Sequence, residues 1–150
     1  MDELRELYQE MILDHYKRPR NYHKLDGASH SAEGHNPLCG DRITIYLLVE
    51  NDKITDICFE GSGCAICTAS ASVMTETLKG KTLADAEVLF GRFHDLVTSD
   101  SPGETDPTSL GKLAIFAGVR EYPIRVKCAT LAWHTFHAAL KGDSDAITTE

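Results

Sequence analysis

Hydrophobic residues near the N-terminus recur every three or four positions, which is the spacing of one face of an α-helix. They run from Leu4 to Tyr16, and Pro19 follows. Proline disfavours helical backbone at the residue before it, so we expect the helix to end there. The polar stretch from Arg20 to Gly27 is then a connection. Residues 28–36 alternate only weakly and are compatible with an edge strand or a loop.

Two runs rich in β-branched and aromatic residues follow, at residues 43–49 and 54–59. Such runs favour β-strands, and the four polar residues between them predict a β-hairpin. Because side chains alternate along a strand, Ile57 and Phe59 should share one face of the second strand, with Cys58 on the opposite face. A cysteine in the middle of a strand is most simply a small buried apolar side chain.

From Ala65 onward the pattern becomes helical. We expect helices over residues 65–78, 83–97 and 109–119, and a last one from near Cys128 to Gly142. Proline, glycine and acidic residues over 98–108 predict an exposed loop, and the tail 143–150 is expected to fray. Strands early and helices late favour an α+β fold: a small antiparallel β-sheet of about three strands with helices packed on one face, in a single domain spanning residues 1–150.

Composition and charge narrow the possible functions. The 150 residues are 42% hydrophobic and 25% charged, as in ordinary globular domains. The net charge of −8 argues against nucleic acid and anionic membranes as partners. The chain begins without a signal-like segment, and no run reaches the roughly 18 apolar residues of a membrane span, so we expect a cytoplasmic protein. Disulfides are rare there, so the five cysteines predict free thiols, catalytic groups or metal ligands.

Three of the cysteines lie at predicted joints between elements. Cys39 precedes the first long strand and is followed by Gly40, which permits a tight turn. Cys64 and Cys128 are expected to begin helices. Free N–H groups and the helix dipole stabilise a thiolate at such a position, so we expect a lowered pKa for both thiols.

Asp41 is two residues from Cys39, so both side chains can face one cavity. With Cys64 and Cys128 they could place three sulfurs and one oxygen around one ion. Zinc accepts such a set, and iron–sulfur clusters also bind thiolates, so ligand type alone does not choose between them. Three thiolates and one carboxylate leave a net charge of about −2 around a divalent ion.

Positive groups should therefore lie near the predicted metal site. Arg125, Lys127 and the two predicted helix starts are the candidates. Cys67 forms a C-x-x-C motif with Cys64, which is compatible with a redox dithiol, an additional ligand or a buried thiol.

Three separated motifs resemble those of the U-type iron–sulfur cluster assembly scaffold family, which contains IscU, SufU and the N-terminal domain of NifU. Lys127 stands at the histidine position of IscU-type scaffolds, and residues 121–126 replace their Leu-Pro-Pro-Val-Lys segment, so the resemblance is nearest to SufU. The stretch 91–111 looks like the SufU insertion, whereas Cys67 stands where serine is more usual. The motifs are Asn36-Pro37-Leu38-Cys39-Gly40-Asp41, Gly61-Ser62-Gly63-Cys64-Ala65-Ile66 and Arg125-Val126-Lys127-Cys128.

The resemblance implies a SufE/NifU-like fold and zinc (Zn²⁺) bound by Cys39, Asp41, Cys64 and Cys128. It implies that Cys39 accepts persulfide sulfur from a pyridoxal-phosphate (PLP) cysteine desulfurase of SufS type, as a sulfurtransferase-like partner rather than a stand-alone enzyme. Other implied partners are iron–sulfur assembly and apo-acceptor proteins. Two alternatives remain: a scaffold that assembles and transfers a 2Fe-2S cluster on the same ligands, and a structural zinc-binding interaction domain.

Overall fold

A computed structural model describes residues 2–37, 39–98, 107–141 and 147–148. The long helices and the hairpin form where the hydrophobic pattern predicts them, with the differences given below. In chain order the elements are α1 (Asp2–Lys17), β1 (His30–Asn36), β2 (Asp41–Glu50), β3 (Lys53–Ser62), α2 (Ala65–Leu78), α3 (Leu83–Thr98), the 3-10 segment η1 (Pro107–Glu121), α4 (Pro123–Leu140) and β4 (Ile147–Thr148).

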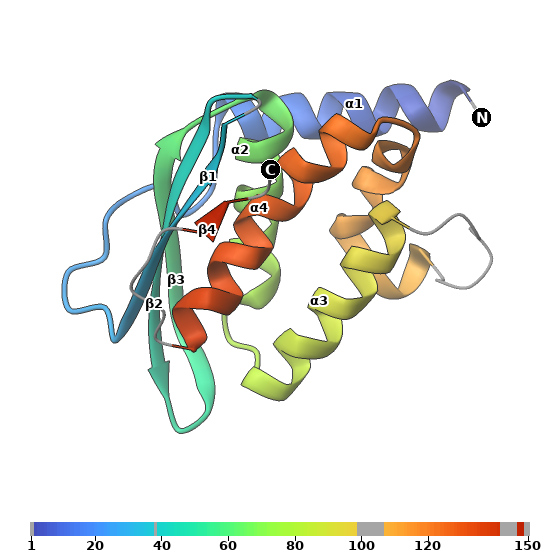
Figure 1. The fold of residues 1–150 in the computed structure, drawn as a ribbon. Helices are drawn as coiled ribbons and strands as arrows, with labels where there is room; N and C mark the ends of the chain where they lie inside the picture. The colour runs from blue at the N-terminus through green and yellow to red at the C-terminus, as the bar shows by residue number, and fades with distance from the viewer. Residues whose placement is uncertain (1, 38, 99–106, 142–146, 149–150) are drawn as a thin grey trace.

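The β-sheet has the strand order β3-β2-β1-β4. Strands β1, β2 and β3 are antiparallel, which confirms the predicted hairpin. Of the ambiguous residues 28–36, residues 30–36 form strand β1. Two residues of the tail, predicted to fray, form β4 instead and pair in parallel with β1, where they satisfy part of a free sheet edge. The helices lie on one face of the sheet, with α4 over β1 and β2 and α2 over β3 (Figure 1). The predicted α+β fold is confirmed.

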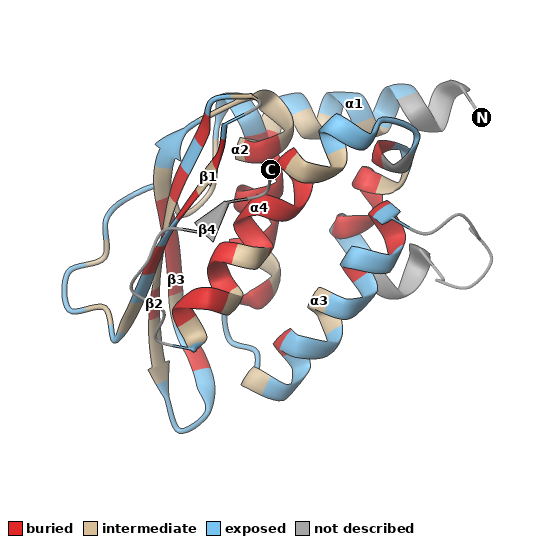
Figure 2. Ribbon diagram, viewed as in Figure 1, coloured by how far each residue is buried: buried red, intermediate tan, exposed pale blue. Residues whose placement is uncertain are grey.

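The hydrophobic core lies between the sheet and the helices, where the buried residues of α2 and α4 face the strands (Figure 2). Trp133 of α4 is completely buried and stacks on Phe93 of α3, with ring centroids 4.9 Å apart. Phe116 of η1 meets Phe93 edge to face at 5.8 Å. Aromatic pairs of this kind add to the stability that burial already provides. They fix α3 and η1 against α4.

Two helical predictions need correction. The last helix begins at Pro123 rather than near Cys128, because proline fits the first turn of a helix, where its missing N–H needs no partner. The helix predicted over 109–119 lies inside the 3-10 segment η1, which is interrupted at Gly111, where φ is 56°. Most of the predicted loop, residues 99–106, lies outside the described residues. Every described helix is too short or too polar to span a membrane.

A buried histidine joins α1 to α2. His15 is 4% exposed, and its Nδ1 lies 2.7 Å from Ser72 Oγ of α2. Its Nε2 lies 3.6 Å from Glu76 Oε1. Burial, followed by the positive charge of Arg20, lowers the pKa of His15, although Glu76 opposes this effect. The folded protein therefore holds His15 in its neutral form.

This buried histidine predicts a loss of stability in mild acid. The unfolded chain binds a proton at His15 near the ordinary pKa of 6.5, before the folded protein does. The free energy of unfolding should therefore fall as pH drops below about 6.5, by about 1.4 kcal/mol for each unit separating the two pKa values. Urea denaturation between pH 7.5 and 5.5 measures the slope. His15→Gln should flatten it, and an equal slope in the variant would contradict the prediction.

Candidate metal centre

The short connection between β1 and β2 presents Cys39 at one end of the sheet. Asn36 and Asp41 pair with each other at the end of the β1–β2 ladder, so only residues 37–40 lie between them. Gly40 has a φ of 72°, a left-handed conformation that glycine adopts without a steric penalty. Cys39 is half-buried, and Asp41 is completely buried. The predicted tight turn is confirmed.

Cys64 lies at the start of α2, as the sequence predicts. It is the N-cap residue, and its Sγ accepts a hydrogen bond from the backbone N–H of Cys67 at 3.4 Å. A hydrogen bond from Cys128, assisted by the backbone N–H groups of Cys67 and Ile66, lowers the pKa of the Cys64 thiol to about 6. Burial and the charge of Asp41 oppose this shift. The predicted helix-start thiolate is confirmed for Cys64.

Cys128 differs from the prediction. It is completely buried in the second turn of α4, and its Sγ lies 3.3 Å from Cys39 Sγ. Hydrogen bonding to Cys64, followed by burial, raises the pKa of Cys128. The predicted lowering is wrong because α4 begins at Pro123, and the helix dipole acts mainly within the first turn. The pKa shifts of Cys64 and Cys128 therefore have opposite directions.

The predicted ligands come together from three parts of the chain. Ligand atoms of Cys39, Asp41 and Cys128 all lie within 4.8 Å of one another, so the group could hold a metal ion. Cys64 adjoins it, with Sγ 4.0 Å from Asp41 Oδ2. Sulfurs bound to a tetrahedral zinc at about 2.3 Å lie about 3.8 Å apart, roughly 0.5 Å more than the 3.3 Å between the Cys39 and Cys128 sulfurs. Cys39, Asp41 and Cys128 are thus close enough to share one ion, and with Cys64 beside them the donors are three sulfurs and one oxygen, a set that zinc accepts.

Asp41 is held from two sides. Its Oδ1 accepts the backbone N–H of Cys64 at 2.8 Å, and its Oδ2 accepts the side-chain amide of Asn36 at 3.2 Å. A Cβ atom at Gly63 would lie 2.7 Å from Oδ1, so only glycine allows the chain to pass this close to the carboxylate. Asn36 and the close approach of Gly63 are the features of the site that sequence reasoning missed. The only sign of either residue in the sequence was its position inside a motif, Asn36 in the motif of Cys39 and Gly63 in the motif of Cys64.

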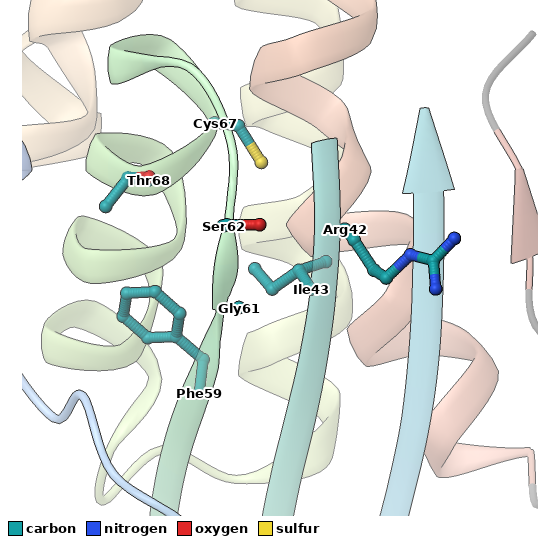
Figure 3. Close-up of a pocket in the computed structure, with 7 residues that line it drawn as sticks. All are labelled: Arg42, Ile43, Phe59, Gly61, Ser62, Cys67 and Thr68. Carbon is teal, nitrogen blue, oxygen red and sulfur yellow. The ribbon is translucent and has the colours of Figure 1, made fainter. Parts of the chain in front are cut away.

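Cys67 lies beside the group but does not belong to it. Its thiol is buried, and burial raises its pKa well above the usual range. Figure 3 shows Cys67 of α2 above a small pocket that it shares with Ser62 of β3 and Ile43 of β2. The pocket measures about 10 Å³, the space of about one water molecule. It is therefore too small for an organic substrate, and an additional ligand role for Cys67 stays a prediction.

The remaining sequence candidates lie outside the group. Arg125 is exposed and Lys127 half-buried, and their supporting role stays a prediction. Cys58 is completely buried with its Sγ 3.3 Å from His23 Nε2. Burial, followed by the charge of Asp56, raises the pKa of Cys58 to about 11. The predicted burial of Cys58 is therefore confirmed.

Comparison with known proteins identifies the family of this chain. Residues 7–141 match the family of NifU-like N terminal domains. The chain is 38% identical over 147 residues to the iron–sulfur cluster assembly scaffold protein IscU of Streptococcus pyogenes serotype M1, covering 97% of this chain and 90% of that protein. It is 41% identical over 127 residues to the zinc-dependent sulfurtransferase SufU of Bacillus subtilis strain 168, covering 85% and 84%.

Solved structures show the same fold. A crystal structure from Fervidobacterium islandicum AW-1, described as an iron–sulfur cluster assembly scaffold protein for the SUF system, aligns with a TM-score of 0.80 and 40% identity. The alignment covers 87% of this chain and 94% of that one. These matches cover most of the chain at high sequence identity, so they establish its family. The chain belongs to the NifU-like N-terminal domain family, together with the IscU and SufU proteins of iron–sulfur cluster assembly.

Proposed function

We propose that this protein accepts persulfide sulfur at Cys39 from a pyridoxal-phosphate cysteine desulfurase of SufS type. Zinc is held by Cys39, Asp41, Cys64 and Cys128. The observation that best supports the proposal is the convergence of Cys39, Asp41 and Cys128 on one spot, with Cys64 beside them and Cys39 half-buried in a short surface turn. A protein partner can reach that turn directly, whereas the pocket beside Cys67 admits no organic substrate.

The ligand set suits sulfur transfer. Bound zinc would keep its cysteine ligands as thiolates at neutral pH. The Cys39 thiolate attacks the terminal sulfur of the persulfide on the desulfurase. A new S–S bond forms at Cys39, the S–S bond of the donor breaks, and the donor cysteine leaves as a thiolate. Cys64 and Cys128, fixed at their helices, would hold the metal together with Asp41.

Two features favour the SufU type of chemistry over the IscU type. Lys127 stands where IscU-type scaffolds have histidine before the last cysteine. The Bacillus subtilis relative, 41% identical, is named a zinc-dependent sulfurtransferase. The second candidate function is assembly and transfer of a 2Fe-2S cluster to an apo-acceptor protein on the same ligands. It is favoured by the names of the scaffold relatives and by the affinity of iron–sulfur clusters for thiolates.

Mixing the protein with a SufS-type desulfurase, its pyridoxal phosphate cofactor and cysteine tests the proposal. Alanine release should accelerate over the desulfurase alone, and peptide mass spectrometry should find the added sulfur on Cys39. An unchanged rate together with an unmodified Cys39 would contradict sulfur acceptance.

Metal analysis separates the two candidate functions. Protein purified without oxygen should contain about one zinc per chain and be colourless if the sulfur-acceptor function is correct. Iron and sulfide in equal amounts, with a brown colour, would instead support the cluster scaffold.

A further inference from the structure

Asn36 connects two of the proposed metal ligands through one amide group. It is completely buried at the end of β1. Its Nδ2 donates to Asp41 Oδ2 at 3.2 Å and approaches Cys128 Sγ at 3.5 Å. Asp41 lies on β2 and Cys128 on α4, so the Asn36 side chain links the sheet to the helix at the proposed metal centre.

The chemistry of the two partners determines which side of the amide faces them. A metal-bound aspartate oxygen and a cysteine sulfur are both hydrogen-bond acceptors, so the amide nitrogen with its two hydrogens suits both. Turning the amide over would place its oxygen against two acceptors. In the observed orientation Asn36 Oδ1 is buried and has no hydrogen-bond partner among the described residues. A buried oxygen without a partner costs stability. The fold therefore accepts an unpaired Asn36 Oδ1 in order to place Nδ2 against Asp41 and Cys128.

The negative charge of the proposed metal centre explains why its ligands need a hydrogen-bond donor. Three thiolates and a carboxylate around one divalent ion have a net charge of about −2. Of the cations that the sequence suggests, Arg125 is exposed to solvent and Lys127 half-buried. Asn36 is completely buried and contacts two ligands directly. Hydrogen bonds to a ligand fix its orientation and tune the strength of metal binding.

We infer that Asn36 is a positioning residue of the metal centre, whose amide holds the Asp41 carboxylate and the Cys128 sulfur in the orientation that a tetrahedral ion requires. The inference rests on the proposed function, because the zinc ligands are those named there. Asn36 does not bind the metal itself, so its effect should appear in metal affinity and coordination geometry rather than in the number of ligands.

Two substitutions test the inference. Asn36→Asp keeps the shape but replaces the two donor hydrogens by an acceptor oxygen. Asn36→Leu keeps a similar volume and removes every polar atom, including the unpaired oxygen, so it should fold even if the aspartate variant does not. Competition with a chromophoric chelator should show zinc affinity reduced 10- to 100-fold in both, the range typical for residues that support a ligand. The visible spectrum of the Co²⁺-substituted protein should also change, since it reports the angles around the ion.

Asn21→Asp is the matched control. Asn21 also donates one amide hydrogen bond, to Thr75 Oγ1 at 3.0 Å, but lies on the connection after α1 and not at the centre. This variant should bind zinc like the wild type and give the same Co²⁺ spectrum. Wild-type affinity and spectrum in both Asn36 variants would overturn the inference and leave the proposed function standing. Failure of the wild-type protein to bind zinc would overturn the proposed function, and the inference with it.

Discussion

Replacing Cys39 by serine should abolish sulfur acceptance and leave the fold intact. Serine lacks the nucleophilic sulfur, so the variant should not accelerate the desulfurase at all, and alanine release should fall to the rate of the desulfurase alone. The fold should survive because Cys39 lies half-buried in the turn at 37–40 and not in the core. In the presence of a zinc chelator, the free energy of unfolding should stay within about 1 kcal/mol of the wild-type value.

Cys58→Ser is the control for this prediction. Cys58 is buried on the second strand of the hairpin, and its contacts are His23 and Asp56 rather than the proposed ligands. Its replacement should leave the acceleration of alanine release unchanged. The structural zinc domain makes a different prediction: there Cys39→Ser should unfold the protein, because a closed structural site contributes folding energy directly. Loss of the cooperative unfolding transition in Cys39→Ser would therefore favour that alternative.

Gly34→Ala should be strongly destabilising, although it adds only one methyl group. Gly34 lies on β1 beneath α4, and a Cβ atom there would be 2.0 Å from Thr135 Oγ1 and 3.1 Å from Leu131 Cδ1. Either the Thr135 side chain turns away and loses its hydrogen bond to the Leu131 carbonyl oxygen, or the helix and the strand move apart. Overpacking of this kind costs about 2–3 kcal/mol, which lowers the melting temperature of a chain of this size by about 5–10 °C. Calorimetry and urea denaturation measure the change.

A second substitution identifies the cause of that loss. Thr135→Ala removes the nearest atom, so that the added Cβ would next meet Leu131 Cδ1 at 3.1 Å and the Cβ of residue 135 at 3.3 Å. The double variant should therefore be more stable than the sum of the two single effects predicts, by about 1 kcal/mol or more. Simple additivity would show that contact with Thr135 is not the reason for the glycine.

The sequence predictions were correct where neighbouring residues gave a clear structural pattern. Cys64 could be placed at a helix start because a glycine-rich turn and a helical pattern adjoin it. The position of Cys128 was missed because the first turn of α4 exposes Ile124 and Arg125 to solvent, which hides the helical pattern. Pro123 was the available signal, since proline is favoured at the first helical position.

Strand β1 was difficult to predict for a different reason. Its inward positions are Ala32, Gly34 and Asn36, which are small or polar because α4 packs closely over them. A pattern based on hydrophobicity therefore finds little alternation there. The role of Asn36 was invisible for the same reason: its partners, five and 92 residues away along the chain, meet it only after the sheet and α4 have assembled.

The pairing of Asn36 with Asp41 also limits how far the reactive sulfur can travel. Two peptide units join the Cα atoms of Cys39 and Asp41, so these atoms can never be more than about 7.6 Å apart. Asp41 is itself buried and hydrogen-bonded to the start of α2. Cys39 is thus on a short tether to a fixed, buried residue. Under the proposed function the persulfide of the desulfurase must therefore be accessible where the two proteins meet, because the tether limits the movement of Cys39.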